Sequence, residues 1–105
     1  MEEKLPELCE LRKLLVEQQI RWLHTHKSKT ATRISELDVK LSRVSNFVYN
    51  SDDYVNAGDL IKDITLEDVE ECFYGFEAKQ QRELARKLLV RTKRRIHSQL
   101  KMILS

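Results

Sequence analysis

Glycine and proline are scarce in this sequence, which has two glycines and one proline among 105 residues. Average usage would give about seven glycines and five prolines in a chain of this length. A small all-β fold needs a turn every roughly 8–12 residues, and therefore more turn-forming residues than this chain contains. Rossmann and P-loop sites need glycine-rich turns. The sequence therefore excludes a small all-β fold and nucleotide sites of these two types.

Cysteine and long apolar runs are also scarce. The two cysteines, Cys9 and Cys72, form no CxxC pair, and we expect both to be free thiols in a reducing compartment. The first residues are charged and lack the apolar core of a secretory signal. No apolar run approaches the roughly 18 residues of a membrane span. These absences predict an intracellular protein, cytoplasmic or nuclear, that does not enter a membrane.

No group of residues has the spacing of a catalytic or metal site. His24 and His26 are two positions apart, so on a helix they would point about 200° away from each other. The acids between Asp52 and Asp63 lack the alternating oxygens, central glycine and terminal glutamate of a calcium loop. We therefore predict no enzyme activity, no metal, no cofactor and no small-molecule substrate.

Leucine and charged residues are abundant: the chain has fifteen leucines, and 34% of its residues are charged. This mixture is typical of long amphipathic helices with solvated faces. The clearest pattern is a heptad-type seam that alternates steps of three and four; it consists of Ile34, Leu37, Leu41, Val44 and Val48. We predict an all-α fold, namely an antiparallel, coiled-coil-like helical bundle with two or three long amphipathic helices and one short helix.

The segment 6–50 begins with a wide apolar stripe. Pro6 is well placed in a first helical turn. Two sets of apolar residues follow at helical spacing, Leu8, Leu11, Leu15 and Trp22 in one set and Val16, Ile20 and Leu23 in the other. The polar junction at residues 24–32 contains neither glycine nor proline. Two interpretations therefore remain open for this segment, a helical hairpin and one continuous helix.

We expect the rest of the chain to form three further parts of the same single domain. Residues 51–59 are rich in Asp, Asn and Ser and predict an acidic loop. Residues 60–76 predict a short helical segment, in which Thr65 and Asp68 form a capping box and Gly75 ends the helix after Phe73. Residues 77–103 predict a basic C-terminal helix.

Charge is distributed asymmetrically, although the net charge is only +2. Residues 51–78 hold nine acids and one lysine, whereas residues 79–105 hold nine Lys/Arg and one glutamate. The basic residues that stand out are Arg86, Arg91, Lys93, Arg94 and Arg95. Three interpretations are open for them: a solvated or internally paired helix face, contact with an acidic protein surface, and contact with nucleic-acid phosphates.

Together these patterns predict a non-catalytic protein–protein interaction module, a small helical subunit or adaptor of a larger intracellular complex. We expect homo- or hetero-oligomers in which apolar seams pack against partner helices. The alternative is a nucleic-acid-binding protein that uses the basic C-terminal helix. The residues expected at the protein interface are Trp22, Ile34, Leu37, Leu41, Val44, Val48, Phe73, Phe76, Leu88, Ile96 and Leu100.

Overall fold

The computed structural model describes residues 4–24, 28–73, 75 and 78–105. This part of the chain contains helices and no strand. The helices are α1 (Pro6–His24), α2 (Ser28–Ser51), α3 (Tyr54–Lys62), α4 (Leu66–Glu70) and α5 (Lys79–Leu104). The all-α class is confirmed, with three long helices as expected and two short helices where we predicted one.

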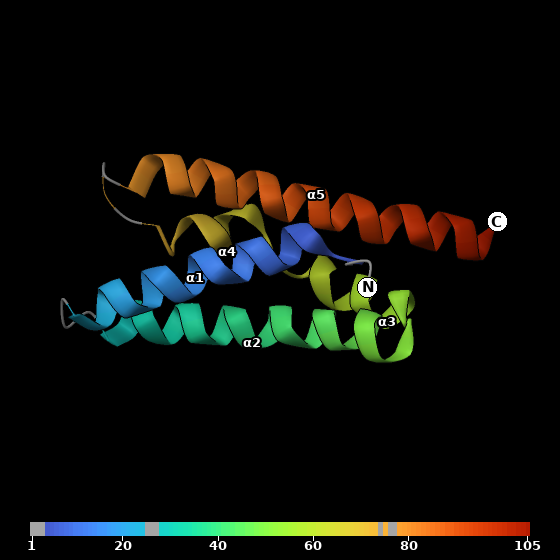
Figure 1. Ribbon diagram of the computed structural model, residues 1–105, viewed down its shortest axis with the longest axis horizontal. Helices are drawn as coiled ribbons and strands as arrows, with labels where there is room; N and C mark the ends of the chain where they lie inside the picture. Colours follow the sequence, from blue (N-terminus) through green and yellow to red (C-terminus); the bar gives the residue numbers. More distant parts are fainter. Residues whose placement is uncertain (1–3, 25–27, 74, 76–77) are drawn as a thin grey trace.

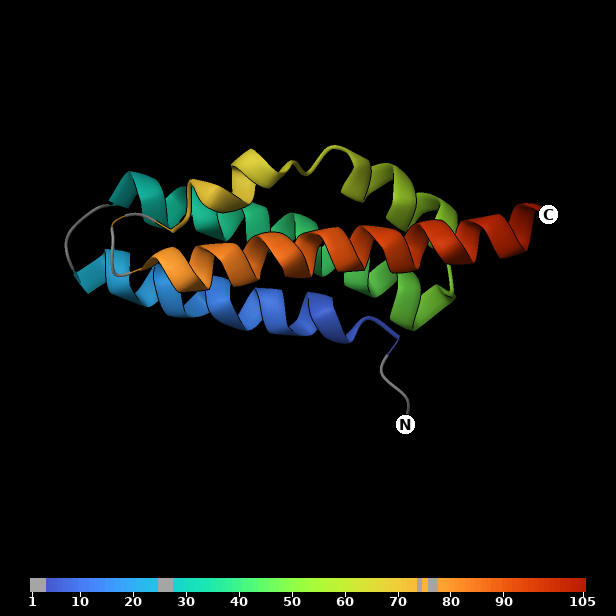
Figure 2. The ribbon, with the colours of Figure 1, turned by 90° about the horizontal axis from the view of Figure 1, so that it is seen from above.

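The long helices and the two short ones form an up-and-down bundle (Figure 1). Helices α1 and α2 run antiparallel and pack side by side, so the segment 6–50 is a helical hairpin rather than one continuous helix. Helices α3 and α4 lie in line and make up the third segment of the bundle, and α5 is the fourth. Figure 2 shows α5 lying over the groove between α1 on one side and α3 and α4 on the other, with α2 behind.

The acidic loop predicted for residues 51–59 is wrong, because only Asp52 and Asp53 separate α2 from α3. Asp52 adopts a positive φ of 48°, which turns the chain. The Asp53 carboxylate accepts a hydrogen bond of 3.0 Å from the backbone N–H of Asn56 and thereby caps α3. Asp53, one of the polar residues on which the loop prediction rested, is therefore the N-cap of a helix.

Gly58 lies inside α3 and permits a close helix–helix contact instead of a turn. A Cβ atom at this position would lie 2.8 Å from Cδ1 of Leu100 on α5. Because glycine has no side chain, α5 can approach α3 closely at this point. Gly58, which lies in the segment predicted as a loop, thus contributes to the packing of α3 against α5.

The capping box predicted at the start of α4 is confirmed. The Thr65 backbone donates to Oδ2 of Asp68 at 2.9 Å, and the Asp68 backbone donates to Oγ1 of Thr65 at 3.1 Å. The helix ends at Glu70, however, and does not continue through Phe73 as predicted.

Side-chain donors from other helices account for the early end of α4. The indole Nε1 of Trp22 donates to the carbonyl oxygen of Cys72 at 3.1 Å, and Nη1 of Arg82 donates to the carbonyl oxygen of Phe73 at 2.6 Å. These two carbonyls are therefore satisfied from outside the helix, so the chain can leave the helix while Phe73 is fully buried. Gly75 follows with a φ of +92°.

The core of the bundle contains two buried polar side chains among the described residues, Gln18 and Thr92. Nε2 of Gln18 donates to Oε1 of Gln81 at 2.7 Å and so links α1 to α5. Oγ1 of Thr92 donates to the carbonyl oxygen of Leu88, one turn earlier, at 2.8 Å. Oε1 of Gln18 is buried and has no hydrogen-bond partner among the described residues.

Candidate protein-interaction surfaces

The heptad-type seam of α2 lies inside the bundle. Each of its members is at most 6% exposed; they are Ile34, Leu37, Leu41, Val44 and Val48. They belong to the continuous core cluster, where α2 packs against α1 and α3. The seam is therefore filled by helices of the same chain, and in this fold it is not a free surface for a partner, contrary to the arrangement we expected.

The other residues expected at an interface lie mostly in the same core. Phe73, Leu88 and Ile96 are buried, and Trp22 and Leu100 are half-buried against the cluster. Phe76 lies outside the described residues. Periodicity identified these apolar positions correctly, but other helices of the same chain cover them.

The wide apolar stripe of the N-terminal segment lies on α1, where some of its residues are buried and others are exposed. Leu8, Leu11 and Leu15 are fully buried. Val16, Ile20 and Leu23 are 45%, 52% and 56% exposed. Positions 16, 20 and 23 follow one line along the helix, because residues three and four apart are neighbours on its surface. We call these three residues the outer α1 stripe.

The outer α1 stripe lies on the side of α1 that adjoins α2. Val16 lines an open depression together with Arg12 of α1 and Asp38 of α2. Nε of Arg12 donates to Oδ1 of Asp38 at 2.9 Å, and this hydrogen bond raises the pKa of the arginine. Both side chains are partly buried, so the ion pair holds the two helices together at one end of the stripe. The opposite side of α1 faces α5, where Gln18 meets its partner.

The predicted basic residues of α5 divide into two groups. Arg86 forms an ion pair of 2.9 Å with Glu70 at the end of α4, and Arg95 forms one of 2.5 Å with Glu7 on α1. The hydrogen bond from Arg95 is the main reason why the pKa of Glu7 is lowered. These two arginines link α5 to α4 and α1, in agreement with the interpretation that the basic helix face is internally paired.

The second group is directed outward. Lys87, Arg91 and Arg94 are exposed, and no carboxylate in the described part of the chain forms an ion pair with any of them. Lys93 is half-buried and lines a separate groove between α3 and α5.

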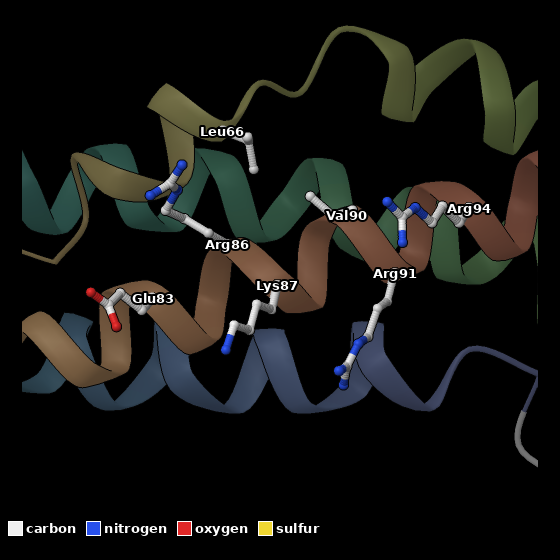
Figure 3. Close-up of a pocket in the computed structure, with 7 residues that line it drawn as sticks. All are labelled: Leu66, Glu83, Arg86, Lys87, Val90, Arg91 and Arg94. Atoms are coloured by element: carbon white, nitrogen blue, oxygen red, sulfur yellow. The ribbon is translucent and has the colours of Figure 1, made fainter.

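The outward cations surround an open depression on the exposed face of α5 (Figure 3). We call it the α5 basic depression; its lining includes Arg86, Lys87, Val90, Arg91 and Arg94 of α5 and Leu66 of α4. Figure 3 shows Arg86 directed toward α4, Arg94 extending along α5 toward Val90, and Lys87 and Arg91 directed over α1. Val90 and Leu66 are half-buried and supply the apolar part of the lining.

The histidines and cysteines considered in the sequence analysis form no metal-binding group in the described structure. No three His, Cys, Asp or Glu side chains of the described residues are placed to hold a metal ion. His24 is exposed at the end of α1, and His26 lies outside the described residues. Cys9 and Cys72 are both free, and burial raises the pKa of the Cys72 thiol to about 12. A thiol with this pKa is almost wholly protonated at neutral pH and is therefore a poor nucleophile.

None of the helices in the described ranges combines the length and hydropathy that a membrane span requires. Comparisons with protein-family models, with curated proteins and with solved structures found no match for this chain.

Proposed function

We propose that this chain is a non-catalytic protein-interaction module, a small helical subunit that binds a helix of another protein along the outer α1 stripe. The observation that carries the proposal is the exposure of Val16, Ile20 and Leu23 along one continuous line of α1. Anchors at positions i, i+4 and i+7 are typical of a helix that packs against a second helix through one apolar face. We retain the function class predicted from the sequence, but we assign the docking surface to α1 instead of α2.

The area available on the stripe sets the expected strength of binding. Full burial of an aliphatic side chain contributes about 1.5–3 kcal/mol, and each stripe residue still exposes about half of its surface. Covering all three would therefore contribute about 3 kcal/mol. A micromolar complex needs about 8 kcal/mol after ordering costs. The partner must therefore also contact the polar rim, where the Arg12–Asp38 pair provides a fixed acceptor and donor.

A charge placed on the stripe tests this proposal. Ile20→Glu should weaken binding of a partner at least tenfold, because it buries a carboxylate in an apolar contact. The matched control is Val55→Glu on α3, since Val55 is 50% exposed and Ile20 is 52% exposed. Both variants should keep the helical circular dichroism spectrum of the parent chain.

The partner can be found by photocrosslinking from the same two positions. A photoreactive phenylalanine analogue at position 20 should capture a protein that the analogue at position 55 does not. That protein is then purified and titrated against the parent chain and both variants by isothermal calorimetry. Equal affinity for the Ile20→Glu and Val55→Glu variants would show that the outer α1 stripe is not the docking surface.

A further inference from the structure

The α5 basic depression is a second surface, separate from the outer α1 stripe, and only some of its cations form ion pairs with carboxylates of the described residues. Arg86 and Arg95 have carboxylate partners within the fold. Lys87, Arg91 and Arg94 form no ion pair with a carboxylate of the described residues, although Arg91 lies close enough to Glu7 to help lower the pKa of that carboxyl. Spacings of four and three residues place the latter three cations along one line of the helix, over about 10 Å.

The apolar lining narrows the choice of ligand. Val90 and Leu66 lie between the cations and are only half-buried. A phosphate backbone has no apolar group to cover them, whereas an amphipathic helix can place an aliphatic side chain there and carboxylates on either side. Glu83 lines one end of the depression and would repel an anion at that end. The occupant that fits is therefore acidic along one edge but not uniformly negative.

The neighbouring segment opposes a long polyanion. Asp59, Asp63, Glu67 and Asp68 are exposed on α3 and α4, beside α5. Asp59 lines the groove adjoining the depression, and Arg94 contributes to both. Surface charges interact over a Debye length of about 8 Å at physiological salt. A nucleic acid that extends from the depression into the adjoining groove would meet the Asp59 carboxylate, whereas a single helix in the depression need not.

We propose that the α5 basic depression binds an acidic, amphipathic helix of a partner protein. Carboxylates of that helix, spaced one turn apart, pair with Lys87, Arg91 and Arg94, and an aliphatic residue between them packs on Val90 and Leu66. Complementary charge accelerates encounter and selects the partner's orientation, and the apolar contact slows its release. This surface lies on α5 and not on the α2 side of α1, so it can be occupied together with the outer α1 stripe.

The test uses a labelled synthetic helix as the probe. The peptide carries glutamates at i, i+4 and i+7 beside a leucine, and a second peptide replaces these glutamates by glutamine. Fluorescence anisotropy with the full chain should detect binding of the glutamate peptide in low salt. Binding should be at least tenfold weaker for the glutamine peptide and should weaken as salt rises.

Variants of the chain locate the contact. Arg91→Glu/Arg94→Glu should weaken binding of the glutamate peptide at least tenfold, and Arg91→Gln/Arg94→Gln should weaken it less. The matched control is Lys79→Glu/Lys101→Glu, which reverses two exposed cations at the ends of the same helix. This control and Ile20→Glu should each change the affinity less than threefold. Chemical shifts of the amides of Val90 and Leu66 should move on titration.

Three results would overturn the proposal. The first is no binding of the glutamate peptide in low salt. The second is equal weakening by the Lys79/Lys101 control, which would show attraction by bulk charge alone. The third is tighter binding of a 20-base-pair DNA duplex or a 20-nucleotide RNA than of the peptide, which would identify the face as a nucleic-acid surface. Ile20→Glu changes the outer α1 stripe and leaves the α5 basic depression intact. A failure of the α5 proposal is therefore distinguishable from a failure of the proposed docking on α1.

Discussion

Truncation of Leu41 to alanine should destabilise the isolated chain by about 3 kcal/mol. Leu41 lies near the middle of α2, is 0% exposed and belongs to the core cluster. Substitution of a buried leucine by alanine costs about 2–5 kcal/mol, which includes the lost transfer free energy and the cavity left behind. For a domain of this size, such a loss lowers the melting temperature by roughly 10–20 °C.

Ile20→Ala is the matched comparison on the outer α1 stripe. Ile20 is 52% exposed, so truncation removes only about 1 kcal/mol of burial. Alanine regains a few tenths of a kcal/mol through its higher helix propensity. The expected net loss is about 0.5 kcal/mol, which leaves a difference of about 2.5 kcal/mol between the two variants.

Urea unfolding measures both values. Far-UV circular dichroism reports the helices, and fluorescence of Trp22 reports the contact between α1 and the turn after α4, where its indole donates to Cys72. The measurements are made at two protein concentrations tenfold apart. If Leu41→Ala changed the free energy of unfolding by less than 1 kcal/mol, or only in a concentration-dependent way, the seam would be an interface between chains and the internal packing described above would be refuted.

Three further predictions concern individual side chains. Gln18→Leu/Gln81→Leu should leave the free energy of unfolding unchanged or raise it in urea titrations, because it removes the buried amide oxygen without a partner in the described structure together with both members of the Gln18–Gln81 hydrogen bond; a loss of more than about 1 kcal/mol would contradict this. The pKa of Glu7 is lowered by Arg95 from an ordinary value of 4.5. The stabilisation is therefore complete above pH 4.5 and is lost as the pH falls through the folded-state pKa. Arg95→Gln should reduce the slope of urea midpoints between about pH 5 and 3, and an unchanged slope would contradict the pairing. Cys72, with a pKa of about 12, should react with a thiol reagent at pH 8 only after unfolding, as measured by absorbance in a Cys9→Ser background; fast labelling of the folded chain would count against its burial.

Local sequence signals predicted most of the helices and their ends. Pro6 begins α1, and the reciprocal hydrogen bonds of Thr65 and Asp68 begin α4. The C-terminal helix was expected at 77–103 and extends over Lys79–Leu104. These features depend on residues within about one turn of each other, because helix hydrogen bonds and caps connect positions three or four apart.

Helix α3 was missed, because the composition of residues 51–59 predicted a loop. Asp, Asn and Ser favour turns and helix caps equally, since in both cases their side chains accept a backbone hydrogen bond. Asp53 acts as a cap, and Gly58 contributes space for Leu100 rather than a turn. The sequence could reveal this only together with the position of α5, which comes close to α3 forty residues later in the chain.

The sequence alone determined the helical class, the amphipathic faces and the contrast between an acidic centre and a basic C-terminal helix. Only the tertiary structure decided which faces remain exposed. Periodicity shows that one side of a helix is apolar, but coverage depends on helices distant in the chain: α2 and α5 bury Leu11 and leave Ile20 half exposed. Ion pairing also depends on residues distant in the chain, because the Glu7–Arg95 pair joins residues 88 positions apart. Composition cannot show which cations find such a partner and which, like Lys87 in the described part of the chain, form no ion pair.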